Sequence, residues 1–223
     1  PCVFPYKLSN LPQAISQLGL KGRYPVIVLV GDKFEKKHAQ VTQQAIHAIC
    51  MSAQELKAVV ICGGTDMGIT AEIGLRRRRN HQNFPLIGIA PQELVSWPSG
   101  PQSTKFFWWG KTRLRLEHQH SHFMLIPGSQ FGDEIPWVND AATLLWKDHQ
   151  SVTVLINGGK AARSAVALSL ETGRPVFAVS DTGRLADELA SETQRDELIT
   201  MIPATSEQQI MKILREALSN RER

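Results

Sequence analysis

Short, continuously apolar runs alternate along the chain with longer segments in which apolar residues recur at helical spacing. Six of the runs are rich in β-branched residues, and each is followed by a turn of glycine, proline or polar residues. They are Val26–Val30, Ala58–Cys62, Leu86–Ala90, His122–Ile126, Val152–Ile156 and Val176–Val179. Runs without polar alternation are typical of strands that are buried on both faces of a parallel sheet.

The segments between and after these runs predict helices. They cover Glu35–Ala53, Gly68–Asn80, Glu134–Asp148, Ala161–Thr172, Leu185–Thr193 and Ser206–Leu218. Ser206 and Gln209 form a capping box at the start of the last helix, and Ile199–Ile202 is a further short strand that can join the sheet. The alternation predicts an α/β protein with an open, mostly parallel sheet and helices on both faces.

The segment from Gln92 to Gln119 interrupts this alternation. It contains Trp97, Trp108 and Trp109 and shows no clear periodicity. A long segment of this kind inside a compact domain is often functional. We expect a single domain over residues 1–223 with an inserted loop or hairpin at about 92–119, which either packs on the domain edge, covers a ligand or forms an interface.

The composition narrows the class of protein. With 42% apolar and 21% charged residues the chain is typical of a soluble globular protein, which excludes collagen, disorder and a coiled coil. Its apolar runs are far shorter than the ~18 residues of a membrane span, and no signal-peptide pattern opens the chain, so we expect a cytoplasmic protein without membrane contact. Cys2, Cys50 and Cys62 have no metal-like spacing, which predicts reduced thiols and no metal site.

The net charge of +4 suits phosphate groups but is too small to indicate nucleic acid. Four consecutive arginines, 76–79, stand near the end of a predicted helix. Since consecutive helical residues point in different directions, only some of them can face one duplex. A solvated helix end, favoured by the helix dipole, is the alternative explanation. We therefore do not expect a nucleic acid as the partner.

Glycines and polar residues follow the predicted strands, where ligands bind in open parallel sheets. The turns are Gly31-Asp32-Lys33, Gly63-Gly64-Thr65-Asp66-Met67-Gly68, Pro91, Pro127-Gly128, Asn157-Gly158-Gly159-Lys160 and Ser180-Asp181-Thr182-Gly183-Arg184. Glycines let backbone N–H groups approach an anion, and helix N-termini add partial positive charge. The turns therefore suit phosphate, with Arg184 placed to bind it bidentately, although glycines also make tight turns without any ligand. Walker and Rossmann glycine motifs are both absent.

Two groups of ionisable residues stand beside these turns. His118, His120 and His122 alternate, so they can converge on one site, where they would contact a ligand or make structural hydrogen bonds. A zinc site would need a further ligand, and none is evident nearby. Asp66 and Glu72 are possible acid–base groups, but an aspartate after Gly-Gly-Thr is equally a helix cap.

Five stretches of the chain resemble a known family. They are Gly63-Gly64-Thr65-Asp66-Met67-Gly68-Ile69, Ile87-Gly88-Ile89-Ala90-Pro91, Leu116-Glu117-His118-Gln119-His120-Ser121-His122-Phe123, Asn157-Gly158-Gly159, and Thr182-Gly183-Arg184-Leu185-Ala186-Asp187. In this order they are similar to the SLOG superfamily of Rossmann-like nucleotide-binding domains, and within it to prokaryotic relatives (LSDAT type) of the amino-terminal domain of TRPM cation channels. The His-Ser-His-Phe and Gly-Arg-x-Ala-Asp elements are the most specific.

The resemblance implies a module that senses a nucleotide or nucleotide-derived ligand, such as ADP-ribose, and signals to another copy of itself or to an effector protein. It implies no required cofactor. Gly63 to Asp66 would hold the ligand, His120 and His122 would line the site, and Gly183-Arg184 would bind phosphate. The full set of candidate ligand-binding residues is Gly31, Asp32, Gly63, Gly64, Thr65, Asp66, Gly68, Ala90, Pro91, His120, Ser121, His122, Gly158, Gly159, Lys160, Gly183 and Arg184.

The chain departs from the phosphoribohydrolase branch of the superfamily. That branch carries Pro-Gly-Gly-x-Gly-Thr and a catalytic glutamate, whereas this chain reads Asn157-Gly158-Gly159-Lys160-Ala161 and continues without the glutamate. Asp181 also places a carboxylate beside the expected phosphate site. These departures favour binding over catalysis. The alternatives are a nucleotide-processing hydrolase that uses His120, His122, Asp66 or Glu72, and nucleic-acid binding like that of the DNA-processing DprA proteins.

Overall fold

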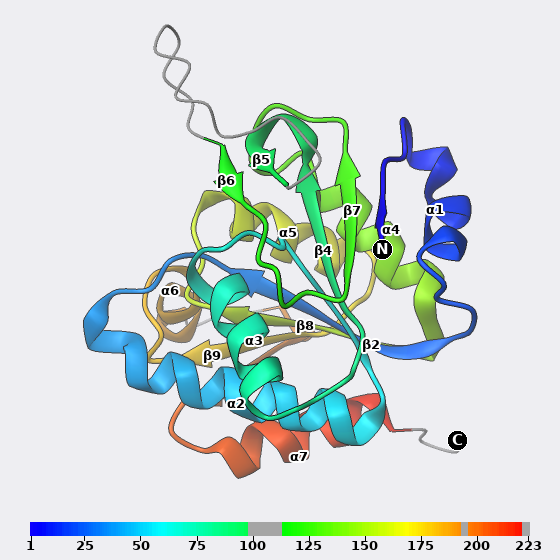
Figure 1. The fold of residues 1–223 in the computed structure, drawn as a ribbon. Coiled ribbons are helices and arrows are strands. Elements are labelled where there is room, and N and C mark those ends of the chain that lie inside the picture. The colour runs from blue at the N-terminus through cyan, green and yellow to red at the C-terminus, as the bar shows by residue number, and fades with distance from the viewer. Residues whose placement is uncertain (98–112, 193–195, 220–223) are drawn as a thin grey trace, which may run out of the picture.

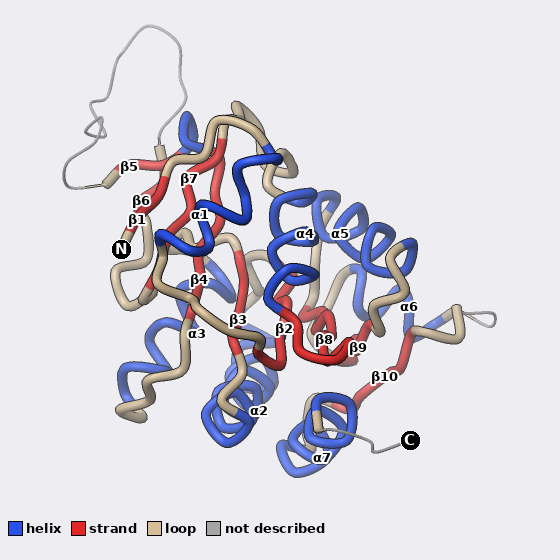
Figure 2. The backbone as a smooth tube through the Cα atoms, turned by 90° about the vertical axis from the view of Figure 1, so that its right-hand side faces the viewer, coloured by secondary structure: helices blue, strands red, loops and turns tan. Residues whose placement is uncertain are grey.

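The computed structural model describes residues 1–97, 113–192 and 196–219. Eight strands form one sheet in the order β1-β7-β4-β3-β2-β8-β9-β10 (Figures 1 and 2), and every neighbouring pair runs parallel. The strands are β1 (Cys2–Val3), β2 (Tyr24–Gly31), β3 (Val59–Cys62), β4 (Leu86–Pro91), β7 (His122–Ile126), β8 (Trp146–Ile156), β9 (Val176–Ser180) and β10 (Ile199–Pro203). The predicted α/β class is confirmed, and the predicted short strand at Ile199–Ile202 joins the sheet.

Helices cover both faces of the sheet (Figure 2). They are α1 (Leu11–Gln17), α2 (Ala39–Leu56), α3 (Gly68–Arg79), α4 (Ile135–Leu145), α5 (Lys160–Glu171), α6 (Leu185–Ser191) and α7 (Glu207–Leu218). Helices α1, α4, α5 and α6 pack on one face and α2, α3 and α7 on the other. Because side chains alternate along a strand, Val28 faces the first core and Ile27 the second. Both are buried, which explains why β2 is apolar throughout.

Tertiary pairing moves one predicted boundary. The helix predicted over Glu134–Asp148 ends at Leu145, and β8 begins at Trp146. Trp146 pairs with Tyr24 at the start of β2, so the sheet takes residues that helical periodicity assigns to α4. The predicted cap of α7 is confirmed, since the Oγ of Ser206 accepts a hydrogen bond from the Gln209 N–H at 3.2 Å.

The segment after β4 adds a small parallel pair at the side of the molecule. It forms the short helix η3 (Gln92–Leu94) and the strands β5 (Val95–Ser96) and β6 (Leu114–Arg115). Strands of a hairpin run antiparallel, whereas β5 and β6 are parallel. The Trp97 ring lies 5.6 Å from that of Phe4, so part of the insertion packs on the edge of the sheet. Trp108 and Trp109 lie outside the described residues.

The strand order creates a switch point at β2. From β2 the chain proceeds outward through β3, β4 and β7, and it then returns to form β8 on the other side of β2. Loops that leave neighbouring strands in opposite directions open a crevice, which is where ligands bind in such sheets. The loops after β2 and β8 therefore mark the place to look for a site.

The first two arginines of the run 76–79 contact the protein itself. Arg76 pairs with Glu72 at 2.8 Å, and the Nε of Arg77 donates to the Phe84 carbonyl at 2.8 Å. Arg78 and Arg79 are exposed at the end of α3. Across the described ranges the cysteines are free thiols, and no helix is both long and apolar enough to cross a bilayer.

Candidate functional site

Asn157 joins the two loops at the switch point. Its side-chain oxygen accepts a hydrogen bond from the Asp32 N–H at 3.0 Å, and its amide nitrogen donates to the Asp32 carbonyl at 3.3 Å. Asn157 has a φ of 52°, a left-handed conformation that asparagine tolerates better than most residues. The base of the crevice between β2 and β8 is thus fixed by one amide side chain.

Thr182 attaches the loop after β9 to the same point. Its hydroxyl accepts from the Asn157 N–H at 2.8 Å and donates to the Val179 carbonyl at 2.6 Å. The Asn157 carbonyl accepts in turn from the Ala186 N–H at 2.9 Å. Three loops of the carboxyl edge therefore form one hydrogen-bonded unit, in which Thr182 is 1% exposed.

Arg184 and Asp32 form an ion pair across the mouth of the crevice. Nη1 of Arg184 lies 2.7 Å from Oδ2 of Asp32, and both side chains are nearly half exposed. A Cβ on Gly159 would lie 2.5 Å from Nη2 of Arg184, so the guanidinium rests against the backbone at the start of α5. Burial raises the pKa of Asp32, but hydrogen bonds from Arg184 and the Lys33 N–H outweigh it and hold the pKa below its ordinary value.

Strained backbone conformations gather at this edge. Asn157, Asp181 and Arg184 all have positive φ without being glycine, and Arg184 combines a φ of 57° with a ψ of −132°. Such conformations cost about 1–3 kcal/mol each and cluster at ligand sites. Gly68 also has a positive φ, of 57°, and a Cβ there would in addition lie 2.6 Å from the Asp32 carbonyl oxygen.

Two helices begin at the crevice without a side-chain cap. Neither Met67, before α3, nor Gly159, before α5, accepts a hydrogen bond from the first turn through a side chain. The first N–H groups of a helix need partners and carry partial positive charge. Together with the Arg184 guanidinium, the start of α5 gives this edge of the sheet the donors that a phosphate requires.

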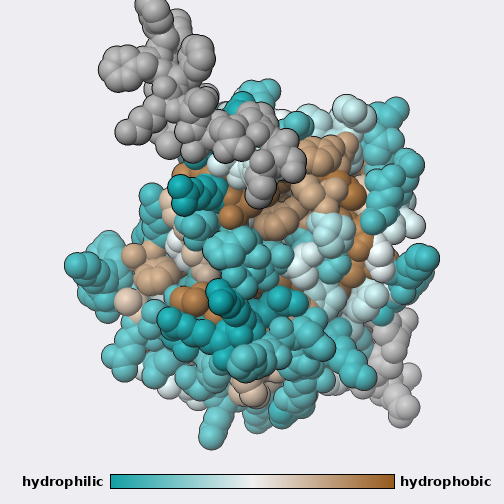
Figure 3. All heavy atoms as spheres, in the orientation of Figure 1, coloured by the Kyte–Doolittle hydropathy of each residue, from teal (hydrophilic) through white to brown (hydrophobic). Residues whose placement is uncertain are grey.

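A cavity of about 250 Å³ opens from this edge and extends between the sheet and helices α4 and α5. Its lining includes seven of the predicted residues: Gly31, Asp32, Gly63, Thr65, Pro91, Gly159 and Lys160. Its walls are largely apolar, with Ile89 and Val138 among them. Asn139 of α4, Ser169 of α5 and Arg174 add polar groups to this lining. A second hollow, of about 560 Å³, runs along α3 and is lined by Asp66, Gly68 and Glu117 among others. Figure 3 shows one face of the molecule as mostly hydrophilic, with a hydrophobic patch near its upper middle.

Gly64, Gly158, Gly183 and Arg184 lie in the loops of this edge without lining the cavity. Ala90 is directed into a small core with Val95 and Leu125. Ser121 and His122 lie at the opposite edge of the sheet, because β7 begins at His122 and its carboxyl end is Ile126. The Ser121 hydroxyl binds the backbone of Leu86, where β4 begins. The structure therefore does not bring Ala90, Ser121 and His122 to the cavity.

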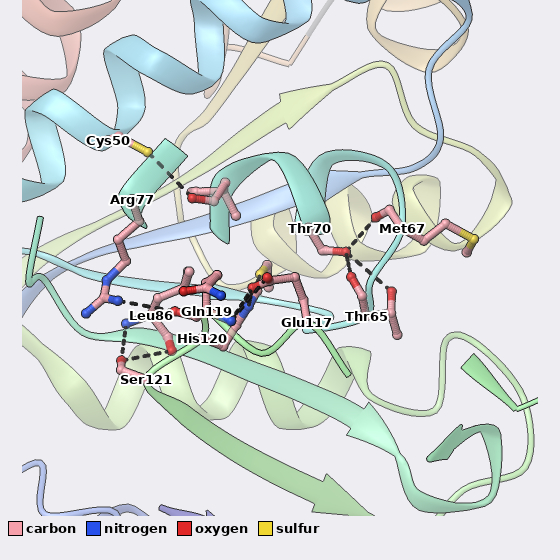
Figure 4. A network of polar contacts seen from close by, with 12 residues as sticks. Cys50, Thr65, Met67, Thr70, Arg77, Leu86, Glu117, Gln119, His120 and Ser121 are labelled. Atoms are coloured by element: carbon pink, nitrogen blue, oxygen red, sulfur yellow. Dashed lines mark hydrogen bonds and ion pairs between the residues drawn. The ribbon is translucent and has the colours of Figure 1, made fainter. Parts of the chain in front are cut away.

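His120 is buried between two partners beneath the edge. Its Nδ1 lies 2.7 Å from Oε2 of Glu117, and its Nε2 lies 3.1 Å from Sγ of Cys62. Figure 4 shows the Glu117 carboxylate directed at the imidazole. Burial lowers the pKa of His120, but the adjacent Cys62 and Glu117 outweigh burial and raise it to about 9. The imidazole itself is fully buried.

The sequence did not single out several residues of this region. Asn157 and Glu117 fall within stretches that resemble the family, and Cys62 is one of three cysteines without metal-like spacing, but the sequence predicts no particular role for any of them. His38, the last residue of the short helix η2 (Lys36–His38) between β2 and α2, contacts the Asp181 carbonyl through Nδ1 at 2.8 Å. No local pattern marks these residues, because their partners are brought to them by the sheet. Within the part of the chain that the structure describes, no group of three or more His, Cys, Asp or Glu side chains is placed to hold a metal ion.

A parallel sheet covered by helices on both faces, with its loops joined by hydrogen bonds at the switch point, defines an α/β protein of the Rossmann-like class. Residues 24–219 match the family described as SLOG in TRPM, prokaryote. The chain therefore belongs to this prokaryotic SLOG family, as the His-Ser-His-Phe and Gly-Arg elements predicted. The fold is one that binds nucleotide-related ligands.

Solved structures share the fold at low sequence identity. TM1055, a structural-genomics target, is 15% identical to this chain with a TM-score of 0.60. The match covers 86% of this chain and 98% of the TM1055 chain. The molybdenum cofactor binding protein from Rippkaea orientalis is 14% identical with a TM-score of 0.59, covering 88% and 99%. The molybdenum cofactor carrier protein from Chlamydomonas reinhardtii is 16% identical with a TM-score of 0.57, covering 89% and 100%. No curated protein matches the sequence.

Proposed function

We propose that this chain binds a phosphate-bearing nucleotide or nucleotide derivative of the ADP-ribose type at the carboxyl edge of its sheet, and that it serves as a ligand-sensing module in signalling. The observation that carries the proposal is the position of Arg184, whose guanidinium lies against Gly159 where α5 begins. Membership of the prokaryotic SLOG family supports it.

Each part of the ligand has a suitable partner at this edge. The phosphate groups bind the first N–H groups of α5 and the free nitrogens of Arg184, since guanidinium and phosphate pair bidentately. The Asp32 carboxylate, which stays ionised beside Arg184, accepts hydrogen bonds from ribose hydroxyls. The base enters the cavity between Ile89 and Val138, where apolar side chains cover its faces.

Binding rather than turnover suits the groups at this edge. The Asp32 carboxylate is already paired with Arg184, and the loop after β8 lacks the glutamate of the phosphoribohydrolase branch. The ligand should therefore be recovered intact after incubation with the protein, as mass spectrometry would show. Cleavage that disappears on changing Asp66 or Glu72 would favour the hydrolase alternative instead.

A thermal-shift titration tests the binding site. ADP-ribose, NAD, AMP, ATP and cyclic dinucleotides are added singly, and a ligand at 100 times its dissociation constant adds about 2.7 kcal/mol of stability. Arg184→Ala should abolish the shift. Arg215→Ala is the matched control, because Arg215 forms an ion pair with Glu55 of nearly the same length and exposure on another part of the surface.

Three outcomes would contradict the proposal. They are no shift with any nucleotide, a shift that Arg184→Ala leaves unchanged, and stabilisation by the molybdenum cofactor alone, the ligand named for two of the structural relatives. The signalling part predicts that the bound ligand changes self-association or the capture of an effector protein. Light scattering with and without ligand measures the first of these.

A further inference from the structure

We propose that Cys62 is a nucleophile in the wall of the cavity, with His120 as its general base and Glu117 as the residue that positions the imidazole. The substrate class is an acyl compound, an ester or thioester, that enters the cavity. Cys62 is the last residue of β3 and lines the cavity beside Gly63 and Thr65. This activity goes beyond nucleotide binding and does not depend on it.

The three side chains form a continuous hydrogen-bonded chain. Sγ of Cys62 lies 3.1 Å from Nε2 of His120, and Nδ1 of His120 lies 2.7 Å from Oε2 of Glu117. A nucleophile within hydrogen-bond reach of a base, with the base oriented by a third group, is the arrangement of covalent catalysis in unrelated folds. Each of the three residues is less than 10% exposed, so their hydrogen bonds are shielded from bulk solvent.

The hydrogen bonds decide which nitrogen acts as the base. A carboxylate only accepts hydrogen bonds, so the proton of neutral His120 is on Nδ1, facing Glu117. Nε2 is left with its lone pair toward the Cys62 thiol. The pKa of His120 is raised to about 9, which favours the imidazolium, the form that the ring takes once the thiol proton has passed to Nε2.

Two glycines make room for this arrangement. A Cβ on Gly74 of α3 would overlap the Glu117 carboxylate, at 1.9 Å from Oε2. A Cβ on Gly88 of β4 would lie 2.9 Å from the ring of Phe123, which stacks on the His120 imidazole with 5.6 Å between centroids. Glu117 is held further by the Gln119 N–H, which lies 3.1 and 3.0 Å from its two oxygens.

Cys50 shows what a buried cysteine of this protein is like without such partners. Its Sγ lies 4.0 Å from the Ile73 carbonyl, and burial raises its pKa to about 12. Cys50 is fully buried and does not line the cavity. It is therefore an internal reference for the reactivity of Cys62.

The chemical step balances without a cofactor. The thiol proton passes to Nε2 of His120, Sγ forms a bond to the acyl carbon, and the bond from that carbon to the leaving oxygen or sulfur breaks. The leaving group takes the proton from His120. Water then attacks the thioester carbon and gives one proton to His120, the Cys62–acyl bond breaks, and the released thiolate recovers that proton, so that the net reaction is hydrolysis.

Alkylation with iodoacetamide, followed by peptide mass spectrometry, measures the reactivity of each thiol in the folded chain. We expect Cys62 to be modified at least about tenfold faster than Cys50, because the thiolate is the reacting form and only Cys62 has a base beside it. His120→Gln should lower the rate at Cys62 by about tenfold. His118→Gln is the matched control, since His118 is exposed and two residues away. Equal rates at Cys62 and Cys50, or no effect of His120→Gln, would overturn the proposal.

Acylation is tested with p-nitrophenyl acetate. We expect a burst of p-nitrophenol with acetyl recovered on Cys62, and loss of the burst in Cys62→Ser. Glu117→Gln should weaken both the burst and the ultraviolet absorbance of the thiolate, and Glu117→Asp should restore part of each, which a merely structural role of Glu117 would not predict. A wild-type protein without either signal refutes the assignment even where a variant fails to fold. Neither assay contains a nucleotide, so its result is independent of the proposed ligand.

Discussion

Arg174 connects helix α4 to the sheet although its side chain is almost completely buried. It is 1% exposed, and its guanidinium donates to Ser151, to the side chain and carbonyl of Asn139, and to Thr143 at 2.7–3.1 Å. These acceptors are uncharged, and burial lowers the pKa of Arg174 to about 10. A buried cation of this kind contributes to stability through its hydrogen bonds rather than through an ion pair.

Replacing this guanidinium should therefore be costly. We expect Arg174→Met to destabilise the protein by about 3 kcal/mol, because it removes the buried hydrogen bonds from the guanidinium to Ser151, Asn139 and Thr143 and leaves the Ser151 hydroxyl without its donor. Urea unfolding measures the change. Arg163→Met is the control, since Arg163 is exposed, and surface substitutions usually stay within about 0.5 kcal/mol. Equal, small effects of the two substitutions would show that the Arg174 network contributes little.

Residues of the site differ in how far local sequence marks them. Gly159 and Arg184 stand in turns whose composition indicates phosphate binding, and the structure brings them together. Asn157 and Cys62 carry no such mark, because an asparagine in a turn and a cysteine at the end of a strand are ordinary. Their partners, Asp32 and His120, are far away in sequence, and only the folded sheet shows which polar groups they meet.

At the scale of elements, the turn from β3 to α3 depends on two backbones that come unusually close. Gly64 has a φ of 67°, and a Cβ there would lie 2.6 Å from Cα of Gly88. Gly173, after α5, has nearly the same φ of 70°, but its Cβ would meet nothing within 4 Å. Comparing Gly64 with Gly173 therefore separates the energetic cost of a left-handed backbone conformation from the cost of close backbone packing.

Alanine substitutions at these two glycines should differ accordingly. We expect Gly173→Ala to cost about 1 kcal/mol, from backbone conformation alone. Gly64→Ala should cost about 3 kcal/mol or more, because the strands must also move apart. Differential scanning calorimetry of the two variants gives the comparison. Similar losses would mean that the turn can shift away from β4 without strain.

Element boundaries were predicted best where local chemistry fixes them. The Ser206 cap and the glycine at the start of α3 lie where the sequence places them. The end of α4 was misplaced because the residues from Trp146 onward pair with β2, and backbone hydrogen bonds to a neighbouring strand outweigh a helical apolar pattern. The parallel pairing of β5 with β6 likewise depends on tertiary contacts.

At the scale of the whole molecule, His122 links overall stability to pH. Its side chain is half-buried at the amino edge of the sheet, and its Nδ1 lies 2.8 Å from the Ser121 hydroxyl. Burial lowers its pKa below the ordinary value, and the amino terminus and Arg77 add to the effect. The folded protein thus binds a proton at His122 less readily than the unfolded chain does.

The sign of the pH dependence follows from this difference. As pH falls through about 6.5, the unfolded chain takes up the proton first, so the contribution of His122 to the free energy of unfolding decreases toward acid. Urea unfolding at a series of pH values should show a smaller acid loss in His122→Gln than in wild type. His118→Gln, at an exposed position, should keep the wild-type slope. An unchanged slope in His122→Gln would assign the acid loss to other groups.

The sequence by itself determined the class of the fold, the family and the glycine-rich turns at the ends of the strands. It did so because burial on both faces demands continuously apolar strands and because tight turns demand glycine, and both requirements act within a few residues. Tertiary structure alone decided that β8 lies beside β2, that Asn157 binds Asp32, and that Cys62, His120 and Glu117 form one chain. These contacts join residues from separate strands and loops, whose pairing depends on sheet order, and no local pattern records that order.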